Sequence, residues 1–170
     1  MSEMRRWMPL FWAAGLVGAA ILWWVLDAVV PAMASAADTG MRLGMATASL
    51  LPAVAVMLAM VQAQMLGRAQ TGAIDPTAGQ DGAFLVVNQR ALSNSAEQMA
   101  CFAPSLLALA AGVTPGRMPG VIALGLVFSA ARLVFWLGYL RAPLLRAPGM
   151  TATFAVNLVT FGAAVWVWWP

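Results

Sequence analysis

Long apolar runs alternate with short polar segments along the chain. The runs cover residues 7–30, 43–66, 83–111 and 120–140, and a fifth follows Gly149 and ends at Trp169. Several of these runs reach the roughly 20 apolar residues that an α-helix needs to cross about 30 Å of hydrocarbon. Apolar and polar residues do not alternate one by one, as they do in the strands of a membrane barrel. The pattern therefore predicts an all-α membrane protein with five long helices.

Two features divide this pattern further. Pro52 interrupts the second run, and the segment 70–82, QTGAIDPTAGQDG, is polar and rich in turn-forming residues. We expect this segment to be the principal loop. No segment has the composition of a linker between separate soluble domains.

Composition identifies lipid as the surroundings of this chain. Hydrophobic residues make up 62% of it and charged residues 9%, which is too little polar surface to cover a soluble globule. The sequence pI is about 10.5, but the arginines stand singly between apolar runs without a basic stripe, which argues against nucleic-acid binding. Cys101 is the only cysteine and histidine is absent, so we predict neither a disulfide framework nor a structural zinc site. We expect the Cys101 thiol to be a packing residue between helices, without a chemical role.

The first apolar run has two interpretations. Arg5 and Arg6 before it, and the small residues 34–36 after it, resemble the charged start and the cleavage site of a signal peptide. Its apolar core is longer than the about 7 to 15 residues of cleaved signals, and Trp23 and Trp24 are typical of anchors at a membrane interface. The length favours a retained transmembrane helix.

The arginines also predict a topology. Cytoplasmic segments of membrane proteins carry more arginine and lysine than external ones. With the N-terminus inside, five crossings leave two arginines outside, Arg42 and Arg117, and place five at the cytoplasmic face: Arg5, Arg6, Arg68, Arg141 and Arg146. The polar first half of the third run then opens toward the cytoplasm.

Polar side chains in that third run follow helical spacing. Arg90, Asn94 and Glu97 stand at i, i+4 and i+7, so all three project from one stripe of a helix. In the fourth run, Arg132 and Tyr139 stand at i and i+7 with Phe135 between them, and Arg146 follows at the start of the last helix. We expect two facing walls of polar side chains.

A charge at the centre of a membrane helix costs about 2.5–3.5 kcal/mol even on the most lenient scale, so these groups should face a cavity or one another. One alternative is structural, with Glu97 paired to Arg90 or Arg132 to hold helices together. Another is a transport pathway lined by Gln62, Gln64, Arg90 and Arg132, although no broken-helix repeat supports it.

The surplus of positive charge favours an anionic ligand, because one carboxylate cannot neutralise four arginines. Arginines would bind two ligand carboxylates, Glu97 an ammonium group and Asn94 a peptide amide, which describes a small acidic peptide such as glutathione. The spacing is equally compatible with a phospholipid headgroup.

Two segments resemble the motifs of a known family. NQRALSNSAEQ at 88–98 and ARLVFWLGYLRAPLLRAPG at 131–149 are similar to those of the MAPEG family, the membrane-associated proteins in eicosanoid and glutathione metabolism. The resemblance runs from about Leu43 to the C-terminus. It implies a four-helix transmembrane domain at 43–170, preceded at 1–42 by an extra transmembrane helix and loop, and a homotrimer that holds glutathione between neighbouring subunits.

The resemblance also implies roles for single residues. Arg90, Asn94 and Glu97 match the stripe that holds glutathione, Tyr139 matches the tyrosine of the family's Gly-Tyr pair, and Arg146 matches the arginine credited with activating the thiol. Arg68 resembles another ligand-binding arginine. Arg132 is a further candidate for binding the ligand, from its helical spacing with Phe135 and Tyr139 and not from the resemblance.

The implied activity is that of a glutathione-dependent transferase or peroxidase acting on lipophilic small molecules that arrive through the bilayer. Phe135 stands where several members have a tyrosine, and Gln98 where some have an aromatic residue. These two departures keep open a second interpretation, a membrane scaffold or ligand-binding protein of the same fold without catalysis.

Overall fold

The computed structural model describes residues 2–32 and 34–170. The side chains of residues 2–5, 34 and 35 lie outside that description, and with them the expectations for Arg5 and for the small residues before Ala36. The regular structure of the described residues is entirely helical, which confirms the predicted fold class. It comprises α1 (Ser2–Val29), η1 (Ala34–Ala37), α2 (Thr39–Ser49), α3 (Leu51–Thr71), α4 (Ala83–Gly112), η2 (Pro115–Arg117), α5 (Met118–Arg141) and α6 (Ala147–Trp168).

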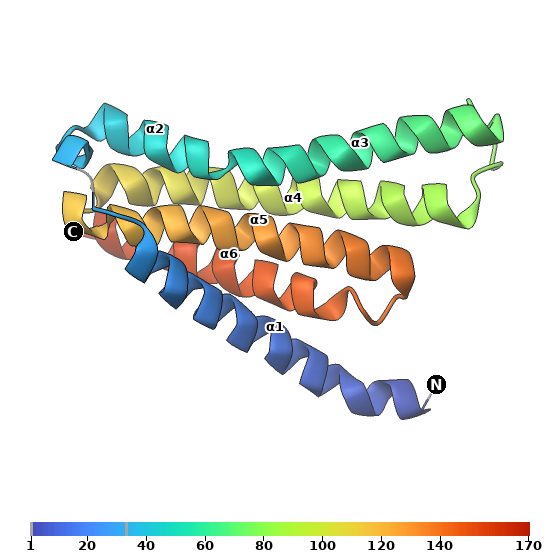
Figure 1. Ribbon diagram of the computed structural model, residues 1–170, viewed down its shortest axis with the longest axis horizontal. Coiled ribbons are helices and arrows are strands. Elements are labelled where there is room, and N and C mark those ends of the chain that lie inside the picture. The colour runs from blue at the N-terminus through green and yellow to red at the C-terminus, as the bar shows by residue number, and fades with distance from the viewer. Residues whose placement is uncertain (1, 33) are drawn as a thin grey trace.

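The long helices lie side by side in one bundle (Figure 1). Helices α2 and α3 follow one another along its length, α4, α5 and α6 run beside them, and α1 crosses obliquely over α5 and α6. Among the described residues, four segments are long and apolar enough to span a membrane: Arg6–Val29, Thr39–Thr71, Pro115–Arg141 and Ala147–Trp168. Helix α4 is longer than three of them, but the polar stripe predicted in its first half lowers its hydropathy.

The second apolar run is two helices instead of one. Helix α2 ends and α3 begins around Leu50, and Pro52 occupies the first turn of α3. Proline has no N–H to continue the hydrogen-bond ladder, and its ring clashes with the carbonyl four residues earlier, so the helix restarts there. Asp38 begins α2 by accepting a hydrogen bond from the Met41 N–H at 2.9 Å.

Small and aromatic side chains bring the helices together around α5. The rings of Phe102 on α4 and Phe128 on α5 stack with their centroids 4.2 Å apart. Gly125 lets α5 approach Ser49 of α2, because a Cβ at residue 125 would lie 2.8 Å from the Ser49 Cβ. Close approach through small residues is how helices associate in lipid.

The helix ends sort the arginines into two groups. The N-terminus of α1, the loop from α3 to α4 and the turn from α5 to α6 all lie at one end of the bundle (Figure 1). Arg68 and Arg141 lie in the last turns of α3 and α5 at this end, and Arg146 lies in the turn before α6. Arg42 and Arg117 belong to segments at the opposite end. The two groups separate as the charge pattern predicted, while the side of the membrane that each end faces remains a prediction.

Arg42 has a structural task that the charge pattern did not indicate. Its side chain is buried and donates to the carbonyls of Ala110 and Ala111 at 3.0 and 3.1 Å, in the last turn of α4. It also donates to the carbonyls of Ala36 and Ala37, each at 3.0 Å. A guanidinium at a helix C-terminus satisfies carbonyls that have no partner within the helix. Arg42 therefore joins the start of α2 to the end of α4.

Candidate functional site

A pocket of about 280 Å³ opens where α4, α5 and the start of α6 meet. Four of the seven predicted site residues line it, together with two apolar side chains; the lining residues are Arg90, Asn94, Phe135, Tyr139, Arg146 and Met150. None of them is acidic. Parts of the two predicted walls thus line one hollow, whereas Glu97 and Arg132 do not line it. Met150 is an addition that no sequence signal indicated.

Local helix geometry explains this convergence. Arg90 and Asn94 are one turn apart on α4, as Phe135 and Tyr139 are on α5, so each pair projects from a single helix face. Arg146 stands immediately before α6.

Two glycines bring the start of α6 against α5. A Cβ at Gly138 would lie 2.7 Å from the carbonyl carbon of Leu145, and a Cβ at Gly149 would lie 2.6 Å from the Cα of Phe135. Contacts this short leave no room for a larger residue at either position. The two glycines therefore fix the segment that carries Arg146 against the wall formed by Phe135 and Tyr139.

Two cation–π contacts follow one another along α5. The guanidinium carbon of Arg146 lies 4.5 Å from the centre of the Tyr139 ring, and that of Arg132 lies 4.0 Å from the centre of the Phe135 ring. The two rings are 5.8 Å apart. Such contacts hold a guanidinium in place without neutralising its charge.

Arg132 lies beneath the pocket and is only 1% exposed. It donates to the Ser95 hydroxyl at 2.7 Å, to the Asn94 amide oxygen at 3.2 Å and to the Thr153 hydroxyl at 3.4 Å, while its Nε has no partner among the described residues. No described carboxylate lies within ion-pair distance. The Asn94 amide oxygen accepts from Arg132, and its amide nitrogen donates to no described residue, so the nitrogen is free to bind a ligand.

Glu97 lies outside this pocket. Its side chain is exposed on α4, about one turn beyond Asn94, and it forms no ion pair with any described side chain. The structural alternative, in which Glu97 pairs with Arg90 or Arg132, is therefore absent from the described part of the chain.

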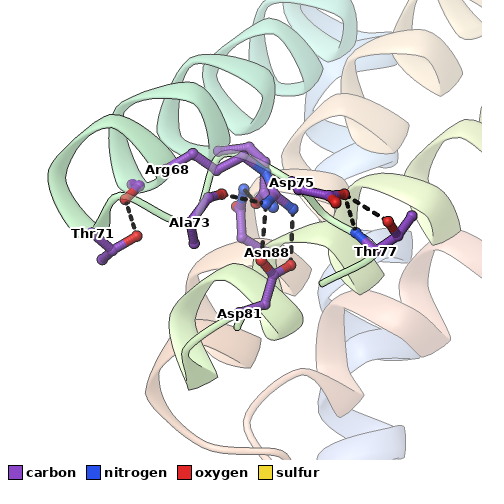
Figure 2. A network of polar contacts seen from close by, with 9 residues as sticks. Arg68, Thr71, Ala73, Asp75, Thr77, Asp81 and Asn88 are labelled. Carbon is purple, nitrogen blue, oxygen red and sulfur yellow. Dashed lines mark hydrogen bonds and ion pairs between the residues drawn. The ribbon is translucent and has the colours of Figure 1, made fainter. Parts of the chain in front are cut away.

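Arg68 is held elsewhere, at the end of α3. It forms the one ion pair between described side chains, a two-pronged contact with Asp81 in which both oxygens accept at 2.8 Å, and it also donates to the Ala73 carbonyl at 2.8 Å (Figure 2). Nearby, the side chain and backbone N–H of Thr77 donate to Asp75 and hold the pKa of that carboxyl below its usual value. Arg68 thus organises the loop before α4.

A buried amide network connects three helices next to the site. Asn88 donates to the Met60 carbonyl at 2.9 Å and to the Gln64 side-chain oxygen at 2.8 Å, and it accepts from the Trp136 indole N–H at 2.8 Å. Asn88 is fully buried. Helical spacing would have found it, because Asn88 and Ser95 are seven residues apart and share one face of α4.

One expectation for α4 was wrong. Cys101 is exposed and does not pack inside the chain; it borders an apolar groove of about 750 Å³ between α4 and α6. Gln98 lies in the same groove and accepts from the Asn157 amide at 2.8 Å, so it faces α6 and not the pocket.

Comparison with known proteins identifies the family of this chain. A family model described as "MAPEG family" matches residues 43–166, which includes every residue of the pocket and leaves α1 outside. No curated protein matches the chain. Because the match covers well over half of the sequence, from α2 to α6, this chain belongs to the MAPEG family.

Proposed function

We propose that this protein is a membrane-embedded, glutathione-dependent transferase or peroxidase that acts on lipophilic electrophiles. Membership of the MAPEG family supports a role in membrane glutathione or eicosanoid metabolism in general. The observation that carries the specific proposal is the pocket at the start of α6, where Arg90 and Arg146 converge above the buried Arg132 without any acidic lining residue.

Glutathione matches this arrangement group by group. One of its carboxylates would bind Arg90, its thiolate would bind Arg146, and a peptide carbonyl would accept from the amide nitrogen of Asn94. Glu97 would bind the ammonium group on the open side of the site. The uncompensated charge of Arg132 adds an attraction for anions that water screens little, because this guanidinium is buried.

We further propose that the site is completed in a homotrimer. The pocket volume is slightly below the about 300 Å³ at which small-molecule sites usually begin, and Arg90, Glu97 and Arg146 are exposed on a single chain. A neighbouring subunit would enclose them. Arg68 would then serve a neighbour's ligand, since Asp81 holds it away from the pocket of its own chain.

Arg146 would activate the glutathione thiol by lowering its pKa. A free thiol with a pKa near about 8.5 is mostly protonated at neutral pH, and a drop of two units requires only about 2.7 kcal/mol. A guanidinium held over the Tyr139 ring can stabilise the thiolate by a charge-assisted hydrogen bond, and the Tyr139 hydroxyl would orient the sulfur.

The reaction then follows from the thiolate. The proton leaves to water, the sulfur attacks an electrophilic carbon, and the leaving group departs with the bonding electron pair. With a hydroperoxide, two glutathione molecules give two electrons and form a disulfide, while the peroxide is reduced to an alcohol and water. The apolar outer surface of the bundle supports entry of such substrates through the bilayer.

The test compares Arg146→Ala with Arg141→Ala in detergent-purified protein. Arg141 is an exposed arginine of the same turn and does not line the pocket, so it is the matched control. We expect Arg146→Ala to lower the rate of conjugation to an aryl halide about 10- to 100-fold at pH 7, with the gap closing above about pH 9 as the thiol ionises by itself. Equal rates for the two variants at pH 7 would remove Arg146 from catalysis.

One observation favours a second candidate, a ligand-binding scaffold without chemistry. Phe135, which lines the pocket, has no hydroxyl where several family members have one. Titration calorimetry with glutathione separates the two proposals. Binding without turnover of aryl halides, epoxides or hydroperoxides would favour the scaffold.

The organisation around the site remains part of the proposal. We keep 43–170 as the family domain and 1–42 as an added transmembrane helix and loop, and we place the pocket at the cytoplasmic face. The gathering of Arg68, Arg141 and Arg146 at one end of the bundle supports this orientation.

A further inference from the structure

Helix α1 lies outside the family match and still docks at defined points on the helices that form the pocket. It packs against α6 and α5, although most of its surface is exposed. At one point the Trp23 indole N–H donates to the Gly120 carbonyl at 3.1 Å, near the start of α5. At the other, Gly15 meets the start of α6.

The contact at Gly15 joins backbone to backbone. Gly15 is buried, and a Cβ at this position would overlap the carbonyl oxygen of Pro148 and lie 3.0 Å from its carbonyl carbon and its Cα. A backbone cannot move aside as the end of a flexible side chain can. Gly18, less than one turn away, is exposed, and a Cβ there would meet nothing within 4 Å.

The segment that Gly15 touches is the one that positions Arg146. Pro148 is two residues after Arg146, and the next residue, Gly149, presses against Phe135 from the opposite side. The first turn of α6 is therefore held between α1 and α5. Within that turn, the Met150 N–H donates to the Arg146 carbonyl at 3.0 Å.

We infer that α1 is a brace for the first turn of α6, and that Gly15 is a positioning residue for Arg146. Without the brace, the turn would lose its contact with α1 and could move away from the Tyr139 ring. The expected loss of rate rests on the proposed function, whereas the expected loosening of the first turn of α6 does not. A misplacement of about 1 Å can cost about 100-fold in rate when a reaction depends on oriented groups.

Gly15→Ala tests this inference, and Gly18→Ala is its matched control. Both changes replace glycine by alanine in the same helix and raise its helix propensity equally, so a difference between them reports the contact with Pro148. The first readout is hydrogen exchange of the Met150 amide in the full-length protein in detergent. We expect exchange to become at least threefold faster in Gly15→Ala and to stay unchanged in Gly18→Ala.

The second readout is the pH profile of conjugation. Gly15→Ala should lower kcat about three- to tenfold and move the pH midpoint upward, because a displaced Arg146 stabilises the thiolate less. Glutathione KM should change less than kcat, since Arg90 and Asn94 stay in place. A brace that served folding alone would leave this midpoint where it is.

The outcomes separate the brace from the proposed enzyme. If Met150 exchanges faster in Gly15→Ala but the native protein shows no turnover, the brace would be supported and the proposed enzyme refuted. Unchanged exchange and kinetics in an active protein would overturn the brace alone. If Gly15→Ala does not fold, Trp23→Phe loosens α1 by removing the bond to Gly120, and native exchange at Met150 in that variant would also overturn the brace.

Discussion

Arg132→Met removes a buried charge that has no carboxylate partner among the described residues. Methionine keeps an unbranched, flexible side chain in the same space, so the change alters charge more than volume. If Arg132 exists to attract an anion, the variant should fold well and bind glutathione poorly. If it exists to hold α4, α5 and α6 together, the variant should unfold more easily.

The hydrogen bonds predict a small effect on stability. Only the bond to Ser95, at 2.7 Å, is short, whereas those to Asn94 and Thr153 are 3.2 and 3.4 Å. Ser95 and Thr153 keep other partners, because their hydroxyls donate to carbonyls of their own helices at 2.8 and 2.7 Å. A bond to a charged group contributes about 1.5–3 kcal/mol, and the desolvation of a buried charge costs several kcal/mol. The two terms offset, so we expect the free energy of unfolding to change by less than about 1 kcal/mol.

Arg42→Met provides the contrast. Arg42 is also a buried arginine, but it donates to four backbone carbonyls. Two of them, those of Ala110 and Ala111, lie in the last turn of α4. Each carbonyl left without a partner costs about 1–3 kcal/mol. We therefore expect a loss of several kcal/mol in stability, with unchanged glutathione affinity in the protein that remains folded.

Thermal unfolding in detergent and titration calorimetry measure the two effects separately. For Arg132→Met we expect a native melting temperature and glutathione binding weakened about 10- to 30-fold, which corresponds to the loss of about 1.4–2 kcal/mol. The reasoning would be refuted if Arg132→Met melted as early as Arg42→Met and its folded fraction bound glutathione within twofold of the native affinity.

The remaining predictions concern the network and the loop beside the pocket. Asn88→Leu should lower the free energy of unfolding by about 1–3 kcal/mol, because Gln64 and Trp136 lose a buried partner, whereas Gln89→Leu on the exposed face should be neutral in thermal unfolding; equal melting temperatures would contradict this. Arg68→Ala and Asp81→Ala should both speed amide exchange in the loop 72–82, but only Arg68→Ala should weaken glutathione binding, by about three- to tenfold in calorimetry, since only Arg68 is proposed to contact the ligand. Equal affinities in the two loop variants would leave Arg68 with its structural task alone.

Much of this molecule follows from local properties of the chain. The apolar runs determine five long helices, because a backbone in lipid must satisfy its hydrogen bonds internally. Pro52 breaks the second run because its own ring prevents the helix from continuing through it. The placement of Arg90 and Asn94 on one side of α4 follows from the helical repeat, and the motifs around them identify the family without any coordinates.

Only the tertiary structure decided which of these groups meet. Spacing along a helix places Glu97 on the stripe of Arg90, but the pocket ends at Asn94 and leaves Glu97, about one turn further along α4, outside it. Nothing in the local sequence pairs Arg68 with Asp81 or directs Arg42 to the end of α4. Such pairings depend on how closely two helices approach, which small contacts such as Gly149 on Phe135 control. Periodicity describes one helix at a time, whereas a site forms between helices.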